Sequence, residues 1–498
     1  MNFRLLAIAG LVATHAAAAD SPYQIHNILT ANSPSASRSA DWKPGEGIAL
    51  EVSGMDFTAD GKLAVAVRKG EVWLLNGALG DSTDRITYKL FASGLHEPLG
   101  VLRDGDSLLV AQRTEVTRLR DTDRDGVADE YLTAGRGWNV SGAYHAYTYG
   151  PKRDGQGNLW VTLNLDMGDH TDNKTGWRGW GGIVTKDGDF QPMVAGMRSP
   201  CGLGANLAGD MFCVDQQGTW IMATPIYHLR KGAFFLNQEG IGSQELPGSP
   251  LKLPASLPNK VPYPEAVRAV PQMRPPAAWL PYNKLGRSGT DLVTCNAGGK
   301  FGPFDGQMLV AEFTDAKISR VFLEKVDGEY QGAAFPFLGG FAAGLVRLQF
   351  APDGSLMVGM TSRDWTSLGT KSYGLQRVKW NGTTPFAIHE MRARPDGFEL
   401  TFTQPVDTKT AGDPASYSMS SYTYLYSSAY GSDEIETKPV KIISATVAKD
   451  GRGVRLKCEG LRELFVHELQ SDGVRSATGT KLDHTQACYT LNRIPKAE

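Results

Sequence analysis

The sequence is poor in charge, in cysteine and in long apolar runs. Only 21% of its 498 residues are charged and the formal net charge is -2, which gives no broad basic surface for nucleic acid or an anionic membrane. Beyond the N-terminal segment, no uninterrupted apolar stretch is long enough to span a bilayer. A Cys-x-x-Cys-His motif is absent, which excludes covalently attached c-type haem. Patterns of long amphipathic helices are also scarce, so an all-helical fold is disfavoured.

The N-terminus has the pattern of a secretory signal peptide. Arg4 precedes the apolar stretch 5–12, and the small residues 16–19 precede Asp20. We expect residues 1–19 to be removed near Ala19 and the protein to be secreted or periplasmic.

Export would permit disulfides among the five cysteines. The spacing of Cys201 and Cys213 suits a local bridge, and Cys458 and Cys488 would link two strands of the C-terminal region, which leaves Cys295 unpaired. Spacing alone leaves the connectivity open.

The most informative feature is a sequence motif that is repeated six times. In each copy, a polar turn that contains glycine is followed by a short apolar run. The copies begin at Asp60, Asp104, Gly157, Gly209, Asp305 and Asp353. Most intervals are about 45 to 52 residues, the period of a four-stranded propeller blade, and one is about twice as long. Generic hairpins of an all-β protein are the alternative.

These repeats predict an all-β fold with a six-bladed β-propeller over residues 49–383, after an N-terminal segment at 20–48. Loops at one face of a propeller converge on a shared pocket, so residues far apart in sequence would meet there. The long interval contains a proline-dense stretch, 247–281, which cannot form central strands. We interpret it as an excursion over one face or as a solvent-facing linker.

Residues 384–498 differ in character and predict a small C-terminal β-sandwich of the immunoglobulin or fibronectin III type. Tyr422, Tyr424 and Tyr426 alternate along one segment and would share one face of a strand. That face would pack against the propeller or bind sugars.

The strongest local motif is an aspartate-rich loop. Asp121, Asp123 and Asp125 alternate before Gly126, and Asp129 follows, as in the first half of an EF-hand. The loop predicts a structural calcium site. An Asx-turn hairpin without metal is the alternative.

A second constellation is Gly196-Met197-Arg198-Ser199-Pro200-Cys201-Gly202-Leu203, followed by Asp215-Gln216-Gln217-Gly218-Thr219-Trp220. Both segments flank a repeat strand, where a propeller presents loops to its channel. Arg198 would clamp an anionic cofactor or substrate, or bridge two loops structurally.

These residues carry a family resemblance. The order Met-Arg-Ser-Pro-x-Gly-Leu, repeat hairpin, Gln-Gly resembles the soluble quinoprotein glucose dehydrogenases and the wider glucose/sorbosone dehydrogenase family. The aspartate-rich loop and the C-terminal region are similar to a secreted bacterial branch labelled membrane-bound dehydrogenases. The resemblance implies a six-bladed propeller that holds pyrroloquinoline quinone and calcium and oxidises sugars.

The resemblance also implies roles for individual residues. Arg198 would lie beside the quinone, Lys317 and Arg347 would face its carboxylates, and the carbonyls of Gly218 and Thr219 would hold its calcium. Because imidazole titrates near working pH, His145 is the candidate base for the sugar hydroxyl, and Asp166 would orient it. Ser199 and Thr219 stand where the family has Asn and Pro.

The sequence therefore predicts an oxidoreductase that acts on a sugar or polyol and passes electrons to a separate acceptor such as a cytochrome or quinone. Two alternatives stay open, a propeller that binds or cleaves carbohydrate without a redox cofactor, and a non-catalytic scaffold.

Overall fold

The computed structural model describes residues 21–29, 50–167, 176–362 and 365–497. The predicted signal peptide and most of the segment 20–48 lie outside these residues. The described chain is almost entirely strands and loops, so the predicted all-β class is confirmed. None of its helices is long and apolar enough to cross a membrane.

Three antiparallel sheets come first in the chain, each with its strands in sequence order. The first holds β2 (Val52–Phe57), β3 (Leu63–Val67), β4 (Glu71–Asn76) and β5 (Thr87–Ala92). The second holds β6 (Val101–Asp104), β7 (Ser107–Ala111), β8 (Val116–Arg120) and β9 (Glu130–Gly135). The third holds β10 (Thr148–Arg153), β11 (Leu159–Leu163), β12 (Trp180–Val184) and β13 (Phe190–Ala195). A short 3-10 helix, Thr83–Arg85, precedes β5.

Three more sheets follow the same pattern. The fourth holds β14 (Gly202–Ala205), β15 (Met211–Val214), β16 (Thr224–His228) and β19 (Ala278–Leu280). The fifth includes β20 (Gly289–Thr294), β21 (Met308–Glu312), β22 (Lys317–Val326) and β23 (Glu329–Leu338). The sixth holds β24 (Leu345–Phe350), β25 (Leu356–Thr361) and β26 (Tyr373–Trp380), and its outermost strand is the N-terminal β1 (Tyr23–Asn27). The sequence did not predict β1, because nothing local indicates a partner so far along the chain.

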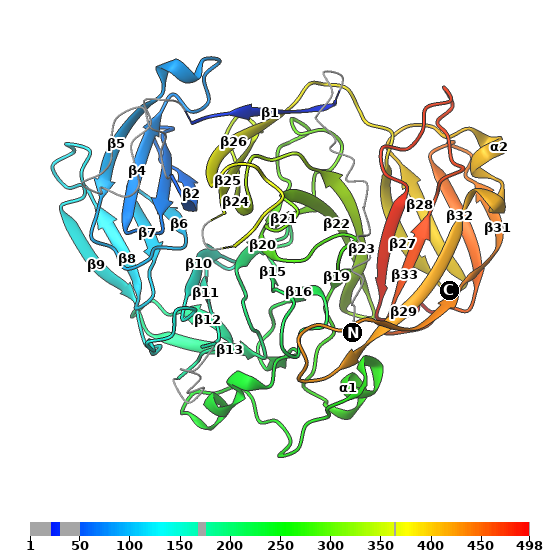
Figure 1. Cartoon of the computed structure of the whole chain (residues 1–498), viewed down its shortest axis with the longest axis horizontal. Coiled ribbons are helices and arrows are strands. Elements are labelled where there is room, and N and C mark those ends of the chain that lie inside the picture. Colours follow the sequence, from blue (N-terminus) through cyan, green and yellow to red (C-terminus); the bar gives the residue numbers. More distant parts are fainter. Residues whose placement is uncertain (1–20, 30–49, 168–175, 363–364, 498) are drawn as a thin grey trace, which may run out of the picture.

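The first strands of these sheets, β2, β6, β10, β14, β20 and β24, are called the inner strands. Each contacts the next in this order, and β24 contacts β2, so they form a closed ring. Figure 1 shows the sheets following one another in chain order around this centre.

The repeated sequence motif forms the turn of the hairpin that joins each inner strand to the next strand, together with that next strand. The apolar runs β3, β7, β11, β15 and β21 are buried along their whole length. The glycine of every copy has a positive φ between 64° and 87°, a conformation that glycine adopts without steric cost. These glycines are Gly61, Gly105, Gly157, Gly209, Gly306 and Gly354.

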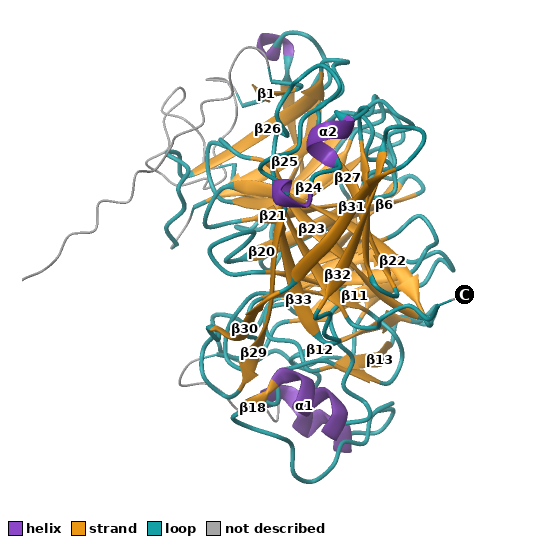
Figure 2. Cartoon of the chain, turned by 90° about the vertical axis from the view of Figure 1, so that its right-hand side faces the viewer, coloured by secondary structure: helices purple, strands orange, loops and turns teal. Residues whose placement is uncertain are grey.

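The long interval between β16 and β19 wraps one end of the molecule. It contains β17 (Ala233–Phe234), a 3-10 helix (Glu239–Glu245), β18 (Val261–Pro262) and α1 (Tyr263–Ala269). β17 pairs in parallel with β13, whereas β18 pairs with the C-terminal strand β29 (Ser418–Tyr426). Within the proline-dense stretch, α1 and β18 contact β29, and Figure 2 shows them beside it at one end of the molecule.

The C-terminal region forms two sheets with one apolar core. One sheet holds β27 (Ile388–Arg394), β28 (Gly397–Phe402), β32 (Gly453–Glu459) and β31 (Lys441–Val447). The other holds β29, β30 (Glu434–Pro439), β33 (Phe465–Gln470) and β34 (Gln486–Leu491). Two short helices, α2 (Thr408–Ala411) and a 3-10 turn (Pro414–Ser416), precede β29. Because β34 also pairs with β23, this second sheet continues the fifth sheet of the ring.

The tyrosine face of β29 packs against the ring. Tyr422, Tyr424 and Tyr426 are all buried, and the ring of Tyr424 lies 5.4 Å from that of Trp279 in β19. This face is therefore not exposed to bind sugars.

All five cysteines are buried free thiols, so the expected bridges are not formed. Strand register pairs Cys213 with Leu203 rather than with Cys201. Cys458 lies in β32 and Cys488 in β34, which belong to different sheets.

Candidate functional site

A pocket of about 420 Å³ lies at one end of the ring of inner strands. Each of the six sheets of the ring contributes to its wall through its inner strand or the loop just before that strand. Their contributions include Ser53, Leu99, Tyr149, Cys201, Thr290 and Arg347. The C-terminal region adds Tyr430.

Arginines paired with tyrosine rings surround this pocket. The guanidinium carbon of Arg68 lies 5.1 Å from the ring centroid of Tyr144. The corresponding distance is 5.3 Å from Arg198 to Tyr430, and 5.9 Å from Arg287 to Tyr282. Such contacts hold a guanidinium in place without neutralising it.

Arg198 is the arginine of this set whose charge is least compensated. Arg68 pairs with Glu97 at 3.2 Å and Arg287 with Asp315 at 3.4 Å. Among the described residues, no carboxylate pairs with the guanidinium of Arg198, which makes only two long hydrogen bonds of 3.4 Å. Its charge is therefore available to an anionic ligand.

A buried carboxylate holds the backbone around Arg198 in place. The buried carboxylate of Asp215 accepts hydrogen bonds from the amides of Arg198 and Ser199 over 2.8 and 2.6 Å. Burial raises the pKa of Asp215 to about 6, against the opposing effect of these bonds. A Cβ at Gly218 would lie 2.1 Å from Nε of Arg198, so only glycine leaves room for this arginine.

His145 lines the same pocket, as predicted for the candidate base. Burial lowers the pKa of its imidazole, and the charges of Arg198, Arg68 and Arg113 lower it further. The ring therefore stays neutral at neutral pH and is able to accept a proton. Its neighbours are aromatic, with the ring of Tyr144 at 5.0 Å and that of Trp365 at 6.3 Å.

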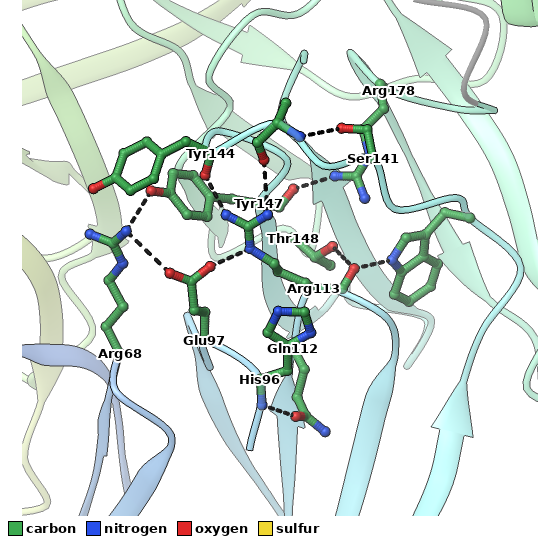
Figure 3. Close-up of polar contacts among 12 residues, drawn as sticks. Arg68, His96, Glu97, Gln112, Arg113, Ser141, Tyr144, Tyr147, Thr148 and Arg178 are labelled. Carbon is green, nitrogen blue, oxygen red and sulfur yellow. Dashed lines mark hydrogen bonds and ion pairs between the residues drawn. The ribbon is translucent and has the colours of Figure 1, made fainter. Parts of the chain in front are cut away.

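Two arginines hold the loop that carries His145. Arg113 donates to the carbonyl oxygens of Ala143, over 2.9 Å, and of Tyr144. Arg178 donates to the carbonyl oxygen of Tyr147 over 2.7 Å, as Figure 3 shows in part. These bonds fix the backbone on both sides of the imidazole.

Glu97 links this loop to the first sheet. Its carboxylate pairs with both Arg68 and Arg113, and Arg68 donates to the hydroxyl of Tyr147 over 2.8 Å (Figure 3). Glu97 has a φ of 47°, a strained conformation that this network of ion pairs stabilises.

Asp166 is fully buried and does not line the pocket. Its charge acts on Arg178, where it opposes the effect of burial, which lowers the pKa of that guanidinium to about 10. The orientation of His145 by Asp166 stays a prediction.

The side chains of Arg347 and Lys317 already form hydrogen bonds or ion pairs with other protein groups. Arg347 donates to the carbonyl oxygens of Ser53, Thr290, Val346 and Leu99. It thus ties three inner strands together at the floor of the pocket. Lys317 pairs with Asp315 at 2.8 Å and is not part of the lining.

The carbonyls of Gly218 and Thr219 already accept hydrogen bonds. The amide of Gly431 donates to Gly218 over 2.9 Å, and the side chain of Asn237 donates to Thr219 over 2.9 Å. The amide of Ile221 also donates to Gly218, over 3.1 Å, so a calcium ion on that carbonyl would displace a donor, whereas within the described chain the carbonyl of Thr219 keeps a free lone pair.

The aspartate-rich loop lies away from the pocket, between β8 and β9. One carboxylate oxygen each of Asp121, Asp123 and Asp129 lies within 4.8 Å of the others, an arrangement suited to one cation. All four carboxylates of the loop also accept hydrogen bonds from backbone amides, Asp125 from Val127 over 2.7 Å and Asp121 from Gly126 over 2.8 Å among them, as in an Asx-turn hairpin. Lys89 donates to the carbonyl of Asp125, so a competing positive charge is present.

Sequence reasoning missed Arg68, Arg113 and the contribution of Tyr430 to the pocket. No local signal marks the first two, since each acts through a partner from another sheet. Tyr430 follows the alternating tyrosines of residues 422–426 in the sequence, but only the tertiary structure places it on Arg198.

A family model described as a domain of unknown function (DUF7133) matches residues 55–244. No curated protein matches the chain. Among solved structures, a putative oxidoreductase (glucose dehydrogenase) from Thermus thermophilus is 16% identical with a TM-score of 0.49, over 72% of this chain and 99% of that one. The PQQ-bound aldose sugar dehydrogenase of Streptomyces coelicolor is 13% identical with a TM-score of 0.46, over 72% and 98%. The soluble aldose sugar dehydrogenase of Escherichia coli is 13% identical with a TM-score of 0.44, over 72% and 100%.

Proposed function

We propose that the pocket binds an anionic, ring-containing small molecule and that the protein oxidises a sugar or a related alcohol. The observation that carries the proposal is Arg198, an arginine on the pocket wall that makes no ion pair within the described parts of the chain. An uncompensated guanidinium beside aromatic rings suits a planar carboxylate.

His145 is the base in this proposal. Its pKa is lowered by burial and by three arginines, so the neutral imidazole takes the proton from a substrate hydroxyl. The exposed ring of Trp365, in the same pocket, offers a flat surface on which a sugar ring packs.

Pyrroloquinoline quinone, which the sequence resemblance implies, fits this pocket in part. It is a planar tricarboxylate, so the guanidinium of Arg198 and the ring of Tyr430 suit its charge and shape. When bound, it supplies an acceptor for the hydride of an alcohol carbon. Arg347 and Lys317 bond to other protein groups, and a calcium ion on the carbonyl of Gly218 would displace one of its two amide donors.

The fold suits such a role. We interpret residues 49–383 as a six-bladed β-propeller, closed by β1, and residues 384–498 as a β-sandwich fused to its fifth blade. Secretion or a periplasmic location and a separate electron acceptor remain part of the proposal.

The two amide donors on the carbonyl of Gly218 favour a second candidate, a propeller that binds or cleaves carbohydrate without a redox cofactor. In that case Arg198 would bind the carboxylate of an acidic sugar, and His145 would serve as its acid or base.

Calcium is proposed at the aspartate-rich loop rather than in the pocket. Asp121, Asp123 and Asp129 would supply its ligands, and the ion would be structural, because none of these residues lines the pocket.

The test is a calorimetric titration of wild type and Arg198→Ala with pyrroloquinoline quinone and with D-glucuronate. We expect at least one to bind, and Arg198→Ala to weaken it about tenfold or more. Arg136→Ala is the control, because Arg136 is exposed and its ion pair is with Asp189, outside the pocket. Sugar-dependent dye reduction with the quinone would select the oxidoreductase, and binding of the sugar acid alone would select the second candidate. Equal affinity of wild type and Arg198→Ala would refute both.

A further inference from the structure

The loop that follows β29 reaches from the C-terminal region into the pocket. Tyr430 is 67% exposed, yet its ring lies on Arg198 and lines the cavity. An exposed aromatic ring at the wall of a cationic pocket is a binding surface rather than a core residue.

This loop is fixed at both ends. On one side, the hydroxyl of Tyr426 donates to the carbonyl of Leu236 over 2.5 Å, and its ring lies 5.3 Å from that of Trp220. On the other side, the amide of Ser432 donates to the carbonyl of Met222 over 3.1 Å.

Gly431 makes the closest approach. Its amide donates to the carbonyl of Gly218, and Tyr430 forms a backbone bridge with Thr219. A Cβ at Gly431 would lie 2.6 Å from Nε2 of Gln217, so glycine allows the loop to lie this close. The loop therefore covers the backbone just beside Arg198.

We infer that the loop Ser427–Asp433 is a wall of the ligand site, that Tyr430 contacts the ring of the bound anion, and that binding in this pocket needs no calcium. This inference rests on the proposed function, because it names a contact of the same ligand. A ligand held by Arg198 presents its ring to the face of Tyr430, and the amide of Gly431 takes the position from which a cation would reach Gly218.

The experiment compares wild type, Tyr430→Ala and Tyr430→Phe in titrations with pyrroloquinoline quinone and with D-glucuronate, in EDTA and in calcium. We expect equal wild-type affinity in both media and a loss of about tenfold for Tyr430→Ala. Tyr430→Phe keeps the ring and should lose less. Tyr131→Ala, which removes a half-exposed tyrosine of β9, is the control for nonspecific effects.

Each result has one meaning. Unchanged affinity in Tyr430→Ala overturns the inference. So does ligand binding by Asp123→Ala, in which the aspartate-rich loop is disabled, if EDTA abolishes that binding and calcium restores it. If a probe binds and its affinity falls in Arg198→Ala but not in Tyr430→Ala, the proposed function is supported and the inference about the loop Ser427–Asp433 is wrong. If neither probe binds wild type, the proposed function fails, and the inference fails with it. Circular dichroism of each variant separates these results from misfolding.

Discussion

The guanidinium of Arg113 donates a hydrogen bond of 2.9 Å to the backbone carbonyl of Ala143. It thereby anchors the loop that carries His145 to the second sheet, while Glu97 pairs with the same guanidinium. A positioning arginine of this kind acts on the imidazole through the backbone and through its charge.

Arg113→Ala should lower the free energy of unfolding by about 2 kcal/mol, because the carbonyls of Ala143 and Tyr144 lose a charged donor and Glu97 is left with Arg68 as its partner. Urea denaturation measures this loss. The exposed pair of Arg120 and Glu130 is the control, and Arg120→Ala should cost less than about 1 kcal/mol.

The same Arg113→Ala variant should raise the pKa of His145, since a nearby positive charge is removed. Proton NMR of the imidazole follows this titration. A variant that loses stability but leaves the pKa of His145 unchanged would show that Arg113 has only a structural role.

The pH dependence of catalysis should follow the neutral form of His145. Its pKa lies below the ordinary 6.5, first through burial and then through Arg198, so kcat/KM should rise through an acid limb below that pH and stay level above it. Arg198→Ala should move this limb to higher pH. His145→Gln should lower kcat/KM by about 100-fold. An acid limb that Arg198→Ala does not move would contradict the assignment.

Calcium should stabilise the protein through the aspartate-rich loop. At a calcium concentration about 100 times its Kd, wild type should gain about 2.7 kcal/mol relative to EDTA. Asp123→Ala should gain less, because one of the three clustered carboxylates is missing. Thermal unfolding measures both. Asp187→Ala, in the exposed turn between β12 and β13, should respond like wild type.

Acid should destabilise the C-terminal region through His467. Burial lowers the pKa of this imidazole to about 3 in the folded protein, whereas in the unfolded chain it has its ordinary value. The unfolded state therefore binds the proton first, and stability present above pH 6.5 is lost as the pH falls toward the folded pKa. Between about pH 7 and pH 4.5 this costs on the order of 2 kcal/mol. Urea denaturation at both pH values should show a smaller loss for His467→Gln than for wild type.

Much of the candidate site was predictable where it depends on loops next to repeat strands. Arg198 and His145 both line the pocket, because each lies close to the start of an inner strand. The contacts of Arg347 and Lys317 were not predictable, because a sequence position does not show which carbonyl or carboxylate lies beside a basic group. The predicted disulfides were wrong for a related reason, because strand register decides which cysteines lie opposite each other.

By itself, the sequence determined the repeated hairpins, because glycine at a positive φ and the short apolar run that follows it are local properties of the chain. It also determined the all-β class. Only the tertiary structure decided that Gly431 covers the carbonyl of Gly218, that Tyr430 lies on Arg198, and that β1 completes the sixth sheet. These contacts join segments that are distant in the chain, and they depend on how whole sheets pack, which no local pattern of residues encodes.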